Sequence, residues 1–178
     1  GTNNREIPVP RGKLLGGSSA INGLVFVRGQ PLDFNLWAQF GNRGWSYDDV
    51  LPYFKRMENY EGPNTNARGT GGPLNVADQT DPVRLNEAFL KACEQAGHKR
   101  VADFNGAEQE GVGYYQLTSR NGVRSSAANA YLRPAKRRPN FHVETDALAT
   151  KVLVENGRAV GVTYVRDGER ATAKARGE

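Results

Sequence analysis

The chain has 178 residues, enough for one ordinary domain or slightly more. Its net charge of +5 comes from residues 90–178, which hold 15 Lys or Arg against 10 Asp or Glu. One cysteine and two histidines exclude an internal disulfide framework and a closed zinc site, so we predict no metal site. No apolar run approaches the roughly 20 residues that span a bilayer, and no secretory leader opens the sequence. We expect a cytoplasmic protein, and leave open whether a larger parent associates with a membrane.

The first thirty residues predict an extended arm followed by a tight turn. Pro8 and Pro10 favour an extended backbone up to residue 13. A pair of glycines, 16 and 17, predicts the turn, and the serine that follows at 18 or 19 predicts a helix N-cap. The apolar stretch 20–27 fits a short buried helix or a strand, because periodicity does not separate the two over so few residues.

Two helices should come next. Pro31 favours the start of a helix over residues 32–40, which Gly41 ends. Ser46 predicts the cap of a second helix over 48–60. Residues 61–75 are rich in Gly, Asn, Pro and Thr, and we interpret them as a long mobile loop.

The middle of the chain predicts one clear amphipathic helix over residues 82–96, ended by Gly97. Its expected apolar face consists of Leu85, Ala88, Phe89, Ala92, Cys93 and Ala96. We then expect a strand over 111–118, a turn at 121–122, and a short helix that a serine at 125 or 126 caps and Pro134 ends.

The last forty residues predict an antiparallel meander. Four segments alternate like strands, at 141–145, 149–155, 159–166 and 170–175. Asn-Gly at 156–157 and Asp-Gly at 167–168 favour two-residue hairpin turns. We therefore predict an α+β fold of short helices with an antiparallel β-meander. Its open edge at 171–178 predicts self-association through exposed strand edges.

The most specific motif is the segment 11–29, RGKLLGGSSAINGLVFVRG. Paired glycines let a ligand approach the backbone, and hydroxyls with turn N–H groups can hold a pyrophosphate. The amide of Asn22 offers a donor and an acceptor to a ring edge. The residues alone fit a site for a flat polar ligand, and they also fit a plain tight turn.

This motif resembles the first signature of the glucose–methanol–choline (GMC) flavoprotein oxidoreductases. The segments 44–56, 121–126, 138–141 and 157–162 resemble the same family in the same order, closest to its choline- and alcohol-dehydrogenase branch. The resemblance implies part of a two-domain fold that binds FAD and substrate. It also implies hydride transfer from the CH–OH group of a small alcohol to FAD, and then to an electron acceptor.

The resemblance also implies roles for particular residues and segments. It places residues 1–30 in an FAD-binding element, 31–140 in a helical and substrate-domain portion, and 141–178 in a meander of the FAD domain. Ile21 stands where some relatives carry a histidine bonded to the flavin, so we expect non-covalent FAD. The implied cofactor-binding residues are Leu15, Gly16, Gly17, Ser18, Asn22, Gly23, Leu24, Val25 and Ala149.

Two parts of the family pattern have no counterpart in these residues. One is the Rossmann-type segment that holds the FAD diphosphate, and the other is the segment with the catalytic histidine. We therefore expect an internal piece of a larger enzyme, inactive and free of FAD in isolation, and assign no catalytic residue. His98 and His142 fit structural or solvated positions better than a catalytic one.

An alternative function follows from the charge. The excess of basic residues after residue 90 fits a binding module for nucleic acid or another anionic partner, with no flavin. The basic run at 136–138 also fits a solvated loop after a helix end. The resemblance favours the enzyme, and we expect no nucleic-acid partner.

Overall fold

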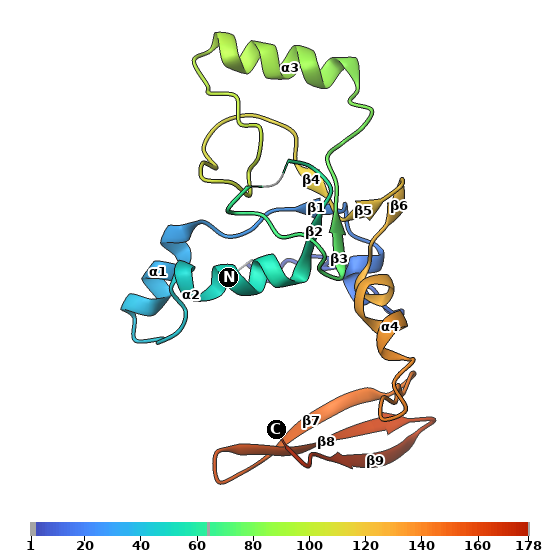
Figure 1. Cartoon of the computed structure of the whole chain (residues 1–178). Coiled ribbons are helices and arrows are strands. Elements are labelled where there is room, and N and C mark those ends of the chain that lie inside the picture. The colour runs from blue at the N-terminus through green and yellow to red at the C-terminus, as the bar shows by residue number, and fades with distance from the viewer. Residues whose placement is uncertain (1–2, 64, 178) are drawn as a thin grey trace. The chain divides into compact units, whose positions relative to one another are not determined.

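A computed structural model describes residues 3–63 and 65–177 (Figure 1). The chain divides into two compact units, residues 1–137 and 138–178. The functional division into 1–30, 31–140 and 141–178 stays a prediction.

The glycine-rich turn forms a short 3-10 helix, η1 (Gly17–Ala20). The prediction that Ser18 or Ser19 caps a helix is wrong, because both serines lie inside η1. The N-cap is Gly16, whose φ of 94° lies in the left-handed region that glycine adopts freely. Of the stretch 20–27, Ala20 ends η1 and Val25–Phe26 form β1, so the strand alternative holds for two residues.

Both helices of the next segment form where their caps predict them. They are α1 (Pro31–Gln39) and α2 (Tyr47–Met57), which lie side by side (Figure 1). Ser46 and Asp49 make a reciprocal capping box at the start of α2. The predicted end of α2 at residue 60 is wrong. At Glu58 the backbone turns extended, and β2 (Glu58–Tyr60) begins.

The segment 61–75 is a crossover between two parallel strands. It connects β2 to β3 (Leu74–Val76), and the two strands pair from Glu58 opposite Leu74 to Tyr60 opposite Val76. The loop prediction is therefore wrong at its last two residues, which belong to β3. Arg68, in the middle of the segment, is buried. Mobility of this segment stays a prediction.

A small apolar core lies where these strands meet. It consists of Phe26, Tyr60 and Val76, with Met57 and Leu74 packed against it. In a separate two-stranded sheet, β1 pairs antiparallel with β4 (Gln116–Leu117). The strand predicted over 111–118 is regular only in those two residues. Its partner β1 is also only two residues long, so the ladder between the two strands is short.

The amphipathic helix α3 (Arg84–Gln95) begins and ends close to its predicted bounds. The prediction that its apolar face is the buried face is wrong. Leu85 is 75% exposed and Phe89 is also exposed, whereas Leu90 is only 4% exposed. Helical spacing identifies an apolar stripe, but which side packs depends on neighbours distant in sequence.

The first unit ends in a hairpin and a helix. The hairpin pairs β5 (Ser119–Arg120) with β6 (Val123–Arg124), and its turn residues Asn121 and Gly122 have positive φ as predicted. Ser126 Oγ accepts a hydrogen bond from the Asn129 N–H at 3.4 Å, the contact expected of a capping serine.

Pro134 does not end the helix that follows this hairpin. A π-helical turn, η2 (Ala128–Leu132), leads into α4 (Arg133–Ala135), which contains the proline. The Arg133 N–H bonds to Ala128 O, and the Lys136 N–H bonds to Leu132 O. These bonds do not require an N–H from Pro134, and so the predicted stop is wrong.

The second unit is an antiparallel meander of three strands. They are β7 (Leu148–Glu155), β8 (Arg158–Arg166) and β9 (Glu169–Lys174), in the order β7-β8-β9 (Figure 1). Both hairpin turns sit at the predicted dipeptides, and Asn156 and Asp167 have positive φ. The strand predicted over 141–145 is wrong. His142 and Arg166 instead contact Glu144, and this segment pairs with no strand of the part described.

Self-association, predicted from the open edge at 171–178, stays a prediction, and the other edge strand of the meander, β7, is a second candidate for it. Leu148, Val152 and Val154 are exposed on β7, which among the residues described pairs with β8 only. Such an edge offers backbone groups to another chain. We expect the average mass of the purified chain to rise with concentration in light scattering, and the change Val152→Lys to reduce that rise. A concentration-independent monomer mass would contradict this prediction.

Candidate functional site

The glycine-rich motif closes into a compact turn. The Gly17 N–H donates to Leu14 O at 2.9 Å, and the Gly12 N–H donates to Ser18 Oγ at 3.2 Å. Gly12 leaves no room for a side chain, because an added Cβ would lie 2.2 Å from Gly17 O. Close approach of the backbone to itself therefore fixes this turn.

The two serines of the motif have different environments. Ser19 Oγ donates to Gly16 O at 2.5 Å and accepts from the Ala127 N–H at 2.9 Å, so it ties the turn to the helix that follows the hairpin. Ser18 Oγ accepts from Gly12, and its own hydrogen has no acceptor among the residues described. Ser18 is therefore the serine available to a ligand.

Arg124 holds the end of the same turn. Its Nη1 atom donates to Ser19 O at 3.2 Å, and to the backbone O and Oδ1 of Asn22, both at 2.7 Å. A guanidinium has donors only, so the oxygen of the Asn22 amide must face Arg124. Both hydrogen bonds to the Asn22 amide involve its oxygen. Its Nδ2 donor has no acceptor within hydrogen-bond distance in the described part of the chain.

Leu24 has a backbone conformation that is rare for its residue type. Its φ of 67° is left-handed, which costs about 1–3 kcal/mol for such a residue. The contacts on both sides hold it there. The Leu24 N–H donates to Asn22 Oδ1 at 3.2 Å, and Leu24 O accepts from the N–H and Oγ1 of Thr118 at 2.8 and 3.1 Å. Strain of this kind is concentrated at functional sites.

The segment 15–25 exposes several apolar side chains in addition to the amide donor of Asn22. Leu15, Ile21 and Val25 are exposed large apolar side chains. An added Cβ at Gly23 would meet nothing within 4 Å, so the space beside this backbone is open. Exposed apolar side chains and a free amide donor in one short segment suit a flat ligand with aromatic faces and a polar edge. An isoalloxazine ring has these properties, and these residues fit it.

A buried ion network begins at Arg28, shortly after this segment in the sequence. Glu58, fully buried, pairs with Arg28 at 2.5 Å and with Arg68 at 2.8 Å, and Arg68 also pairs with Asp103 at 3.1 Å. The Gly69 N–H adds a hydrogen bond to Glu58 Oε2 at 2.9 Å. Burial lowers the pKa of Arg28, and the neighbouring Glu58 opposes that shift. Two guanidiniums and two carboxylates thus balance in charge.

Asn105 connects the network to β1. The Arg28 N–H donates to Asn105 Oδ1 at 2.8 Å, and Asn105 Nδ2 donates to Phe26 O at 3.0 Å and to Gln116 Oε1 at 3.1 Å. The amide of Asn105 thus supplies the donor and acceptor that a neighbouring strand would supply. These contacts hold residues 26–28 at the end of the candidate site.

Asp78 accepts hydrogen bonds from two further side chains of this region. Gln116 Nε2 donates to Asp78 Oδ1 at 3.2 Å, and Tyr60 OH donates to the same atom at 2.9 Å. Burial and the Asp78 carboxylate together raise the pKa of Tyr60, so this hydroxyl stays protonated. Tyr60 and Gln116 therefore act as structural donors.

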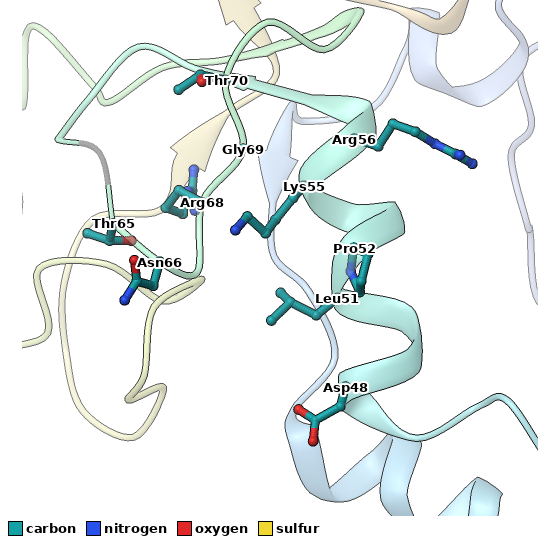
Figure 2. Close-up of a pocket in the computed structure, with 10 residues that line it drawn as sticks. All are labelled: Asp48, Leu51, Pro52, Lys55, Arg56, Thr65, Asn66, Arg68, Gly69 and Thr70. Carbon is teal, nitrogen blue, oxygen red and sulfur yellow. The ribbon is translucent and has the colours of Figure 1, made fainter.

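A cavity of about 690 Å³ lies between α2 and residues 65–70 (Figure 2). Leu51 and Lys55 point toward that segment, whereas Arg56 points away from it (Figure 2). No predicted cofactor-binding residue lines the cavity. Arg68, at its wall, is already paired with buried carboxylates. The geometry therefore assigns this cavity no part in the candidate site.

Ala149, the remaining predicted cofactor residue, belongs to the second unit. It lies on β7 opposite Tyr164, and the register shifts between Ala149 and Lys151. Such irregularities free backbone groups from the strand ladder. The role of Ala149, like those of residues 15–18 and 22–25, stays a prediction.

Other kinds of site find little support in the residues described. They contain no group of three or more His, Cys, Asp or Glu placed to hold a metal ion. No helix in the described part is long and apolar enough to cross a membrane. His142 contacts Glu144 at 2.7 Å, and this hydrogen bond, with the charge of Arg166, lowers the pKa of the Glu144 carboxyl.

A family model described as GMC oxidoreductase matches residues 1–178. The chain belongs to the GMC oxidoreductase family. This GMC chain is 51% identical to an oxygen-dependent choline dehydrogenase of Sinorhizobium fredii, over 99% of the chain and 32% of that relative. It is 50% identical to the enzyme of the same name from Rhizobium meliloti, with the same coverage. The resemblance stated from the sequence motifs is confirmed.

Solved structures agree with this assignment. Pyridoxine 4-oxidase from Mesorbium loti is 32% identical with a TM-score of 0.83, over 92% of this chain and 33% of that one. An FAD-dependent oxidoreductase from Chaetomium thermophilum is 29% identical with a TM-score of 0.87, over 98% and 33%. The predicted α+β fold class within the GMC fold is confirmed. The chain spans about a third of the length of its relatives.

Proposed function

We propose that this GMC chain forms one wall of the flavin site in an FAD-dependent oxidoreductase that oxidises the CH–OH group of choline or a similar small alcohol. The surface that Asn22 and its exposed apolar neighbours form carries the proposal. The names of the relatives at about half identity support choline as the substrate class. FAD, when bound, takes a hydride from the alcohol carbon and passes the electrons to an acceptor.

The predicted cofactor-binding residues other than Leu15 each have a proposed task. Gly16 and Gly17 let the cofactor approach the backbone, and the Ser18 hydroxyl donates to its pyrophosphate and ribityl region. Asn22 and Gly23 border the ring, together with Leu24 and Val25, whose neighbours fix the backbone there. The backbone at Ala149 contacts the adenine. The base that accepts the alcohol proton is not assigned to any residue of this chain.

The proposal is tested on the full-length protein that carries this chain. We expect it to be purified with flavin absorption, and choline to bleach that absorption in the absence of oxygen. Glycine betaine is the matched control, because it keeps the quaternary ammonium and lacks the CH–OH group. Acid precipitation should release the flavin, as Ile21 offers no covalent link. A protein without flavin, or one that no small alcohol bleaches, would contradict the proposal.

For the 178-residue chain alone, we expect no stoichiometric FAD and no oxidation of choline. The 178 residues contain no G-x-G-x-x-G dinucleotide-binding motif, and pyrophosphate contacts contribute much of dinucleotide binding. Titration of FAD into the purified chain, followed by flavin fluorescence, measures this directly. Saturable binding of one FAD per chain would contradict the expectation.

The basic binding module is not favoured. Several cations of residues 90–178 are engaged inside the chain: Arg100 pairs with Glu87, Lys99 with Glu108, and Arg124 binds backbone oxygens. We expect no gel shift with nucleic acid even at low salt, where such binding is strongest. A cytoplasmic location also stays part of the proposal.

A further inference from the structure

A single guanidinium nitrogen of Arg124 donates hydrogen bonds to three oxygens of residues 15–25, here called the flavin-edge segment. These oxygens are Ser19 O, Asn22 O and Asn22 Oδ1. Arg124 is partly buried and lies at the end of β6. The hairpin that carries it is fixed by the Asn121-Gly122 turn, and the Ser125 N–H bonds to Thr118 O at 2.8 Å just beyond it. The cation is therefore held in place independently of any ligand.

We infer that Arg124 is a positioning residue that decides which polar group Asn22 presents to the flavin; this inference rests on the proposed function. Arginine offers only donors, so it binds the amide oxygen and turns Nδ2 away from itself. Without Arg124, only the longer bond from the Leu24 N–H, at 3.2 Å, would hold the amide oxygen in place. With it, Asn22 presents a donor, and the edge of the ligand that meets it must be an acceptor.

The backbone depends on the same contact. Asn22 Oδ1, which Arg124 binds, also accepts from the Leu24 N–H at 3.2 Å. That bond is one of those that hold Leu24 at its left-handed φ. Arg124 therefore fixes both the polarity of the amide and the path of the chain beside Gly23.

The chemistry predicts two effects of the fixed donor. A donor beside a ring acceptor strengthens binding of the oxidised flavin. It strengthens binding of the electron-rich reduced flavin more, because hydrogen bonds to charged groups are stronger than neutral ones. Arg124 should thus increase flavin affinity and raise the flavin midpoint potential.

The test compares Arg124→Ala with the wild type in the full-length, flavin-loaded protein. We expect the dissociation constant of FAD from the apoprotein to rise at least about tenfold and the flavin midpoint potential to fall. Arg120→Ala is the matched control. Arg120 lies in the same hairpin, its side chain is 67% exposed, and its ion pair with Glu61 is 4.0 Å long. It should change neither quantity.

Rescue separates positioning from general damage to the fold. Added guanidinium at a non-denaturing concentration should restore part of the FAD affinity and potential of Arg124→Ala, and leave Arg120→Ala unchanged. Arg124→Lys keeps the charge and should fall between the wild type and the alanine variant. Unchanged affinity and potential in Arg124→Ala would overturn the inference.

Asn22→Asp tests the polarity without touching Arg124. The new carboxylate can still pair with the guanidinium, but its second oxygen replaces the donor with an acceptor. We expect this variant to fold and to lose FAD affinity and potential to at least the extent of Arg124→Ala. Flavin binding equal to the wild type would overturn the inference even if Arg124→Ala fails to fold. A wild-type protein that holds no flavin would instead overturn the proposed function.

Discussion

Replacement of Glu58 by glutamine is expected to destabilise the chain by about 3–5 kcal/mol, the range for breaking a buried ion pair. Glutamine has nearly the same shape as glutamate. The change therefore removes the negative charge and leaves no empty space where the Glu58 side chain lies. Arg28 and Arg68 then remain buried with Asp103 as the only carboxylate in contact with either of them among the ion pairs described. Urea unfolding followed by circular dichroism measures the loss as a lower midpoint.

Glu108→Gln is the matched control for this prediction. Glu108 also pairs with a cation, Lys99, but its side chain is 63% exposed. Water solvates both partners of such a pair when it is broken, so the free energy of unfolding should change little. A Glu58→Gln midpoint that falls no further than that of Glu108→Gln would show that the buried network is not held by its charge balance.

The parts of the fold that the sequence predicts correctly depend on local contacts. The cap at Ser46, the start at Pro31 and the turns at 156–157 and 167–168 each involve residues within a few positions of one another. The backbone preference of each residue type is then enough to predict the structure.

The predictions that fail depend on distant partners. Leu85 and Phe89 have the spacing of a buried face, yet it is Leu90 that packs. The strands expected over 111–118 and 141–145 are short or absent, because a strand also needs a neighbour of matching length. Periodicity cannot supply that information.

The residues of the candidate site also differ in whether the sequence alone reveals them. The glycines and serines of the motif are recognisable, because their spacing follows from one turn. Arg124 and Glu58 carry no such pattern, since they act through contacts 10 to 105 residues away along the chain. A lone buried charge can be found from sequence only when its partner is known.

The second large effect is expected from Gly23→Ala. Within the chain, an added Cβ at Gly23 meets nothing within 4 Å, so the flavin-free protein should fold and melt like the wild type. If the ring lies against this backbone, the new methyl group occupies space that the flavin needs. Overpacking of that size should weaken FAD binding about tenfold or more in the full-length protein, measured by titration of the apoprotein.

Gly12→Ala gives the contrast that makes this result interpretable. Its Cβ would lie 2.2 Å from Gly17 O, so it distorts the turn whether or not flavin is present. Both variants should lose FAD, but only Gly12→Ala should lower the Tm of the flavin-free protein. Wild-type FAD affinity in Gly23→Ala would mean that the ring does not approach this backbone. The flavin contact would then have to lie elsewhere along the segment, beside the exposed side chains of Leu15 and Val25.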